Sequence, residues 1–188
     1  MRIISGYFRG KKIAEPNSKN TRPLKDLTKE SIFNIIQHNK FIKIKIEKSE
    51  VLDLFSGVGS FGLECISRGA KHVLFCESYS QTLKILKKNI NEFNCENKTQ
   101  IITENIFNIN HFKNITKNKF EIIFLDPPYK EKRLNYLLNE IINLKILKKN
   151  GIFIIHRHKK ENDILPEELK IFKIKIYGVS KIIFGLIP

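Results

Sequence analysis

The stretch from Val51 to Glu64, VLDLFSGVGSFGLE, holds three glycines in a GxGxxG pattern between an apolar run and a helix-like run. Gly57, Gly59 and Gly62 suit a tight turn, a close backbone approach to a ligand, and close packing of a helix on a strand. Glu77 ends the next expected strand, 20 residues after Gly57. This strand–loop–helix unit constrains the fold strongly, because it is typical of α/β proteins built on a parallel sheet.

Strand-like and helix-like segments continue to alternate along the chain. We expect strands at 51–55, 72–77, 99–103, 120–125 and 151–156, and helices at 59–68, at 79–93, from Asn105, and at 132–144. Residues 169–177 and 181–186 are expected to form a closing hairpin around Gly178. The pattern predicts an α/β fold with a Rossmann-like, mostly parallel, doubly wound sheet and an antiparallel C-terminal edge hairpin.

The first 48 residues differ from this rhythm. Residues 1–15 read as two short strands around turns at Gly6 and Gly10, and 28–38 read as a helix. A polar connector over 39–50 carries a short alternation at 41–46. We therefore expect an N-terminal hairpin and helix appendage over residues 1–48, which would bind RNA, and a main domain over 49–188.

The apolar run at 120–125 ends in Asp126, Pro127, Pro128 and Tyr129. The two prolines cannot continue a strand, so they predict a rigid corner at the edge of the sheet where ligands bind in open α/β folds. Asp126 and the Pro127 carbonyl can accept hydrogen bonds from the exocyclic amino group of a base, while Tyr129 stacks on its ring. The alternative is a plain turn with a surface Asp and Tyr.

The acidic residues distinguish between possible cofactors. Glu77 stands where a carboxylate can bind both hydroxyls of a ribose, which fits NAD and S-adenosylmethionine equally. Asp53 lies inside the strand just before the glycine loop, with Ser56 following. A carboxylate there would repel a pyrophosphate but can attract the cationic methionine end of S-adenosylmethionine. Because a nicotinamide site has no use for the 126–129 motif, we expect methyl transfer.

The net charge of +15 points to a polyanionic partner such as nucleic acid, although a composition rich in Ile, Lys and Asn raises the lysine count everywhere. Residues 1–25 hold seven of the cations against one acid, and Tyr7 and Phe8 lie among them, a mixture that suits phosphates and unpaired bases. A solvated basic hairpin is the alternative. Three cysteines without a CxxC spacing, and no apolar run of membrane-spanning length, favour a cytoplasmic protein without a metal site or membrane association.

These residues resemble the class I S-adenosylmethionine-dependent methyltransferases, and more closely the bacterial 16S ribosomal RNA (guanine-N2)-methyltransferases of the RsmD type. The glycine loop and the 126–129 motif are shared by many methyltransferases. Two N-terminal segments narrow the resemblance: RIISGYFRGKKI at 2–13 and TRPLKDLTKESIFNII at 21–36. The ending YGVSKIIF at 177–184 is also similar to the closing strands of that family.

The resemblance implies roles for individual residues. S-adenosylmethionine would bind at Asp53, Phe55, Ser56, Gly57, Gly59, Gly62, Glu77, Asn105 and Ile106, with Glu77 on the ribose and Asn105 and the Ile106 backbone bounding the adenine. The catalytic motif would be Asp126, Pro127, Pro128 and Tyr129. Arg2, Arg9, Lys11, Lys12, Arg22 and Lys25 would bind RNA, and Arg22, Pro23, Asp26 and Glu30 would cover the cofactor.

Two departures from the family pattern stand out, namely Leu24-Lys25 and His156-Arg157-His158. At a strand end, we expect His156 and His158 to face solvent or to be packed, rather than to act as a base or bind a metal.

The expected function is methylation of the exocyclic N2 of a guanosine in 16S ribosomal RNA. The expected substrate is 16S rRNA, the small ribosomal subunit or its assembly particle, and the expected state of the protein is a monomer. A DNA adenine-N6 methyltransferase can share the 126–129 motif, and a non-catalytic RNA-binding assembly factor can share the fold. The sequence does not name the modified nucleotide.

Overall fold

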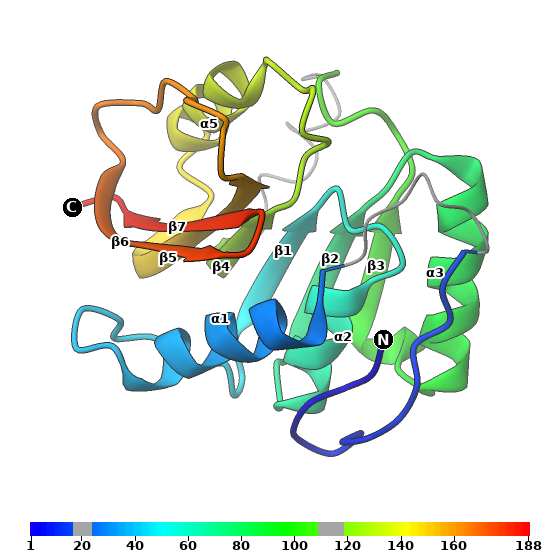
Figure 1. The fold of residues 1–188 in the computed structure, drawn as a ribbon. Coiled ribbons are helices and arrows are strands. Elements are labelled where there is room, and N and C mark those ends of the chain that lie inside the picture. The colour runs from blue at the N-terminus through cyan, green and yellow to red at the C-terminus, as the bar shows by residue number, and fades with distance from the viewer. Residues whose placement is uncertain (17–23, 109–118) are drawn as a thin grey trace.

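A computed structural model of the chain describes residues 1–16, 24–108 and 119–188 (Figure 1). In these ranges one sheet has the strand order β3-β2-β1-β4-β5-β7-β6. Its strands are β1 (Glu50–Leu54), β2 (His72–Cys76), β3 (Thr99–Ile102), β4 (Phe120–Leu125), β5 (Leu147–His158), β6 (Lys170–Tyr177) and β7 (Ser180–Leu186). The strands from β3 to β5 run parallel, and β7 pairs antiparallel with both β5 and β6. The predicted parallel sheet with an antiparallel C-terminal hairpin is confirmed.

The helices follow the predicted pattern closely. They are α1 (Asp26–His38), α2 (Ser60–Ser67), α3 (Ser80–Glu92) and α5 (Leu134–Asn143), and a short 3₁₀ turn spans Glu96–Lys98. The predicted helix from Asn105 begins as a turn, in which the Asn108 amide donates to the Asn105 carbonyl, and residues 109–118 lie outside the described part of the chain. Within the described ranges, no helix is long and apolar enough to cross a bilayer.

Apolar side chains cover both faces of the sheet, as the doubly wound prediction requires. Alternate residues of each strand point to opposite faces, so Val51 packs in the cluster that contains α1, α2 and α3 residues, whereas Leu52 packs in the cluster that contains α5 residues. Asp53 shares the parity of Val51 and therefore faces α2. Figure 1 shows α1 and α2 on one side of the sheet and α5 on the other.

The N-terminal segment differs from the predicted pair of strands. Among the described residues, a single antiparallel bridge, between Arg2 and Lys12, joins its two arms. Backbone hydrogen bonds support this pairing: Ile3 N donates to the Lys11 carbonyl at 2.9 Å, and Ile13 N donates to the Met1 carbonyl at 3.1 Å. Between the arms the chain bonds to α2 instead, where Tyr7 N donates to the Ser67 carbonyl at 2.7 Å and Phe8 N donates to Ser67 Oγ at 2.9 Å. The segment is therefore a hairpin-like loop that packs along α2, with one bridge in place of two regular strands.

The alternation at 41–46 also does not form a strand. Ile42, Ile44 and Ile46 are partly buried against the same cluster as α1 and α2, so their periodicity reflects side-chain packing without strand pairing. Ile3 and Phe33 belong to that cluster together with sheet residues. A division into units at residue 48 stays a prediction.

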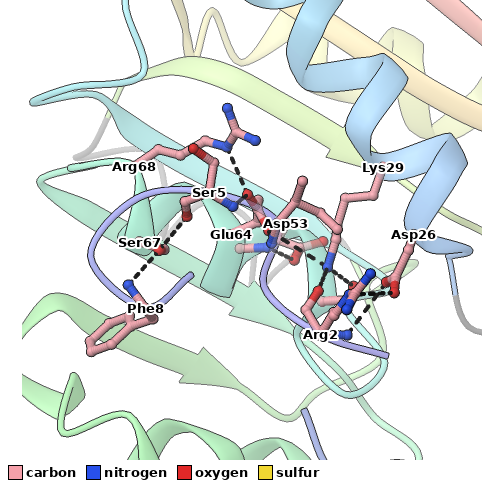
Figure 2. Close-up of polar contacts among 12 residues, drawn as sticks. Arg2, Ser5, Phe8, Asp26, Lys29, Asp53, Glu64, Ser67 and Arg68 are labelled. Carbon is pink, nitrogen blue, oxygen red and sulfur yellow. Dashed lines mark hydrogen bonds and ion pairs between the residues drawn. The ribbon is translucent and has the colours of Figure 1, made fainter. Parts of the chain in front are cut away.

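A buried ion cluster joins the N-terminal segment and α1 to α2 (Figure 2). Glu64 of α2, with a fully buried side chain, accepts hydrogen bonds from Ile4 N at 2.7 Å, Ser5 N at 3.0 Å and Arg68 Nε at 2.8 Å. The ammonium of Lys29, equally buried, lies 3.7 Å from the Glu64 carboxylate. Burial lowers the pKa of Lys29, against the opposing effect of Glu64. Lys29 Nζ also donates to Ser60 Oγ at 3.2 Å, so the cluster reaches the first turn of α2, directly after the glycine loop.

Candidate active site

The order of the strands places a crevice at the ends of β1 and β4. These neighbouring strands belong to the two halves of the sheet, and ligands of open α/β sheets bind outside the carboxyl ends of strands at such a point. Leu54 lies opposite both Cys76 and Leu125 in the register. Glu77 and Asp126, the residues that follow those two, therefore leave the sheet at the same level.

A cavity of about 730 Å³ occupies this edge of the sheet. It is lined by residues that follow β1, β2 and β4, and by Met1, Pro16 and Leu24 from the N-terminal part of the chain. The predicted site residues among its lining are Asp53, Phe55, Ser56, Gly57, Glu77, Asn105, Asp126, Pro127, Pro128 and Tyr129. Elements far apart in the sequence therefore supply one site.

Two of the three glycines shape the loop without lining the cavity. Gly59 has a φ of +87°, a backbone angle that residues with a side chain rarely adopt. A Cβ atom on Gly62 would lie 2.3 Å from the Phe75 ring, so the predicted close packing of helix on strand is confirmed. The loop is anchored at its start, where Ser56 donates from its amide and its hydroxyl to the Cys76 carbonyl.

Asp53 is buried directly beneath the loop, with 1% of its surface exposed. Its Oδ2 accepts a hydrogen bond from Gly62 N at 3.0 Å, while Oδ1 has no partner among the described residues. Burial raises the pKa of Asp53 well above its usual value, and the charges of Asp126 and Glu77 add to the rise. Such a buried acceptor fits a ligand that brings a cationic donor.

Glu77 is held by two backbone donors at the end of β2. Its Oε2 accepts from Gly57 N at 2.8 Å, and its Oε1 accepts from Tyr79 N at 2.7 Å. Burial raises its pKa, and these hydrogen bonds oppose the rise. The carboxylate is thereby fixed in the cavity wall, with lone pairs left for the hydroxyls of a ribose.

Asp126 follows β4 and is hydrogen-bonded to His156 of β5. Asp126 Oδ1 lies 2.8 Å from His156 Nδ1, and His156 Nε2 lies 2.9 Å from Ser180 Oγ. The Tyr129 ring meets the rings of His156 and His158 edge-on, at centroid distances of 6.1 and 5.0 Å. His156 is packed, with 5% of its surface exposed, whereas His158 is partly buried.

Arg157 supports the same corner from beneath the surface, and its side chain is fully buried. Its guanidinium donates to the carbonyls of Pro128 and Glu131, both at 3.0 Å, and pairs with Asp163 at 2.7 Å. The corner at Pro127 and Pro128, called the proline corner below, is therefore held by its own stiff backbone and by the hydrogen bonds that the Arg157 guanidinium donates. In the sequence, Arg157 stands out only as part of a departure from the family pattern.

Some predicted residues lie outside the cavity lining. Ile106 packs in the hydrophobic core on the α5 face of the sheet. Arg2, Arg9, Lys11, Lys12 and Lys25 are exposed on the N-terminal part of the chain. Two of these cations already have partners: Arg2 Nε lies 3.8 Å from Asp26, and the Lys11 ammonium lies 4.5 Å from the centre of the Phe93 ring. Arg22 and Pro23 fall outside the described residues.

The cavity also contains residues that sequence reasoning did not identify. Phe107 packs near Phe55, and the Arg133 guanidinium lies 3.6 Å from the centre of the Phe107 ring. Arg133 also pairs with Glu131 at 2.8 Å, which lowers the pKa of that carboxyl to about 2. Of these residues, only Phe107 could have been suspected from the sequence, because it lies two residues after Asn105.

The chain is similar to known proteins over nearly its whole length. The family described as "Conserved hypothetical protein 95" matches residues 1–185. Ribosomal RNA small subunit methyltransferase D of Buchnera aphidicola is 38% identical over 175 residues, covering 93% of this chain and 86% of that protein. The solved structure of HI0767 from Haemophilus influenzae superposes with a TM-score of 0.74 and 28% identity, over 98% and 96% of the two chains.

A more distant structure, that of SMU.776 in complex with SAH, shares the fold at a TM-score of 0.61 and 16% identity, over 79% of this chain and 48% of the other. The family match extends over nearly the whole sequence, including both N-terminal segments that narrowed the resemblance. The chain therefore belongs to the conserved hypothetical protein 95 family, the RsmD-type methyltransferases that its motifs resemble.

Proposed function

We propose that the protein transfers a methyl group from S-adenosylmethionine to the exocyclic N2 of a guanosine in 16S ribosomal RNA. The observation that carries the proposal is the cavity in which Asp53, Glu77 and Asp126 meet. The relatives named small subunit methyltransferase D support ribosomal RNA as the substrate class. The SAH complex of SMU.776 supports the choice of cofactor.

The residues of the cavity suit this cofactor. Oδ1 of Asp53, which has no partner among the described residues, would accept from the α-amino group of the methionine end, and Glu77 would accept from the ribose hydroxyls. Asn105 lines the cavity beyond Glu77 and would bound the adenine. When bound, S-adenosylmethionine supplies an electrophilic methyl group.

The proline corner would then present the target base. The guanine amino group is a weak nucleophile, because its lone pair is delocalised into the ring. Hydrogen bonds to Asp126 and to the Pro127 carbonyl would orient that nitrogen, and Asp126 would accept the proton it releases. Tyr129 would stack on the base that has left its helix.

The N-terminal segment would bind the RNA. It borders the cavity through Met1 and Pro16 and carries exposed cations at Arg9 and Lys12. The proposed substrate is the small subunit or a particle on its assembly pathway, which the protein meets as a monomer in the cytoplasm.

The proposal is tested by methyl transfer from labelled S-adenosylmethionine. The substrates are 16S RNA and small ribosomal subunits from cells that lack this gene, and the product nucleosides are identified by mass spectrometry. We expect N2-methylguanosine from the wild-type protein and a loss of at least about 100-fold in turnover for Asp126→Asn, because general-base assistance contributes about 10²–10⁴-fold. N6-methyladenine on DNA controls would instead assign the protein to the adenine-N6 class.

A further inference from the structure

We infer that His156 is a positioning residue for Asp126, and that it orients the catalytic carboxylate through a hydrogen-bonded chain from Ser180. This inference rests on the proposed function and adds to it a residue that contacts the proposed catalytic carboxylate. His156 lines the cavity yet is 5% exposed, so its ring is enclosed on the side away from the substrate.

The two hydrogen bonds of the ring determine its protonation pattern. Nδ1 lies 2.8 Å from Asp126 Oδ1, and an ionised carboxylate only accepts hydrogen bonds. Nδ1 therefore carries the hydrogen in the neutral ring, and Nε2 accepts the hydrogen of the Ser180 hydroxyl at 2.9 Å. Free imidazole side chains favour the other tautomer, so the pair of neighbours selects the form that donates to Asp126.

The consequence for Asp126 is a fixed division of labour between its oxygens. Oδ1 is occupied by His156, which assigns Oδ2 to the incoming amino group of the base. In the reaction, a nitrogen–carbon bond forms as the sulfur–carbon bond breaks, and the proton lost by nitrogen passes to Oδ2. Holding the carboxylate at the correct angle matters because a misplacement of about 1 Å can cost about 100-fold in rate.

The same contacts occur in the nucleophilic triads of hydrolases, in the order Ser180, His156 and Asp126. Access to substrate distinguishes the two uses. Ser180 is 8% exposed and does not line the cavity, whereas Asp126 does. The group that can reach a substrate is therefore the carboxylate, and the serine serves as the anchor at the far end of the chain.

The strand order explains how these residues meet. β5 lies between β4, which ends at Asp126, and β7, which begins at Ser180. His158 pairs with Ser180 in the antiparallel register, and His156 lies two residues along on the same face of β5. His156 is thus held between its two partners by strand pairing, and the pairing also brings both histidine rings to Tyr129.

Three variants separate positioning from general support of the site. His156→Leu removes the donor to Asp126, and we expect kcat to fall about 10–100-fold with little change in KM for S-adenosylmethionine. His156→Asn places an amide nitrogen near the position of Nδ1 and should restore most of that loss. His158→Leu removes a ring that lies closer to Tyr129 than His156 does, without the hydrogen bond to Asp126, and should lower kcat much less than His156→Leu.

Thermal unfolding and calorimetric binding of S-adenosylhomocysteine establish that each variant is folded. A kcat for His156→Leu within twofold of wild type, or an equal loss in His158→Leu, would overturn the inference. If the wild-type protein transfers no methyl group to RNA, the proposed function fails. The inference is then tested by nitrogen NMR of the wild-type ring at a pH where it is neutral: the Nδ1–H tautomer supports it and the Nε2–H tautomer refutes it.

Discussion

Asp53 illustrates how a residue proposed to bind the cofactor can reduce the stability of its own fold. Its carboxylate is buried, one oxygen has no partner among the described residues, and burial raises its pKa. Because the folded-state pKa of Asp53 lies above its unfolded value, the protonated carboxyl favours the folded state. This contribution to stability is fully present below the ordinary Asp pKa. That contribution is lost as the pH rises toward the raised value.

Replacing Asp53 by the isosteric Asn should therefore affect stability and binding in opposite directions. Asp53→Asn keeps an acceptor for Gly62 N but removes the buried charge, so the melting temperature of the cofactor-free protein at pH 8 should be at least that of wild type. The two proteins should converge as the pH falls to 4. Affinity for S-adenosylmethionine should fall about 10–100-fold, since a hydrogen bond to a charged group contributes about 1.5–3 kcal/mol.

Calorimetric melting over a pH series and isothermal titration would measure both effects. A lower melting temperature for Asp53→Asn at pH 8, or unchanged affinity for the cofactor, would contradict this account of the site.

Sequence patterns anticipated some residues of the cavity and not others, for a physical reason. Asp53 lies near the end of β1, while Glu77 and Asp126 directly follow β2 and β4, and the parallel order of the strands brings those ends together. His156 and Arg157 act through partners 30 and 26–29 residues away, contacts that depend on the pairing of β5 with β4 and β7. Hydrophobic periodicity carries no information about such polar contacts between strands.

At the level of secondary-structure elements, α2 is the element on which the site depends. It begins directly after the glycine loop and holds Glu64, which bonds to the N-terminal segment and faces Lys29 of α1. The sequence predicted α2 but not this role, because its period identifies an apolar face and not a buried ion pair within it. The two N-terminal arms pair through a single bridge rather than as regular strands, since Glu64 and Ser67 accept from amides that lie between the paired positions.

Glu64→Gln should destabilise the protein strongly. It leaves the buried Lys29 ammonium without its countercharge, and breaking one partner of a buried pair typically costs about 3–5 kcal/mol. Glu92→Gln on α3 is the matched control, because its partner Lys88 is exposed at a distance of 3.7 Å, and such pairs contribute about 0.3–0.5 kcal/mol. Urea unfolding would compare the two variants, and equal losses in free energy of unfolding would show that the buried cluster is not a stability determinant.

Across the whole molecule, the charge is strongly positive, at +15 for the chain. Lysine is abundant everywhere, so position matters more than number. The cations of the N-terminal segment lie on the part of the chain that borders the cavity, whereas those of β6 lie on the edge strand at the end of the sheet.

A double charge reversal tests this distinction. Arg9→Glu with Lys12→Glu should weaken RNA binding and reduce its salt dependence, by about 0.7–0.9 in the log–log slope for each phosphate that the protein no longer neutralises. Lys170→Glu with Lys175→Glu changes the net charge equally on exposed positions of β6 and should leave the slope near that of wild type. Filter binding of 16S RNA across a salt series would measure both, and equal effects would indicate attraction by net charge alone.

The attachment of residues 1–16 to α2 and α3 also affects the order in which the chain can fold. Ile3 and Ile13 are buried in the cluster that includes Leu63 and Phe93, and Ala14 bonds to Asn89. These contacts span up to about 80 residues, so a high contact order is built into the start of the chain. During synthesis this segment leaves the ribosome before α2 and α3 do, so it must wait for α3 before its apolar residues are covered.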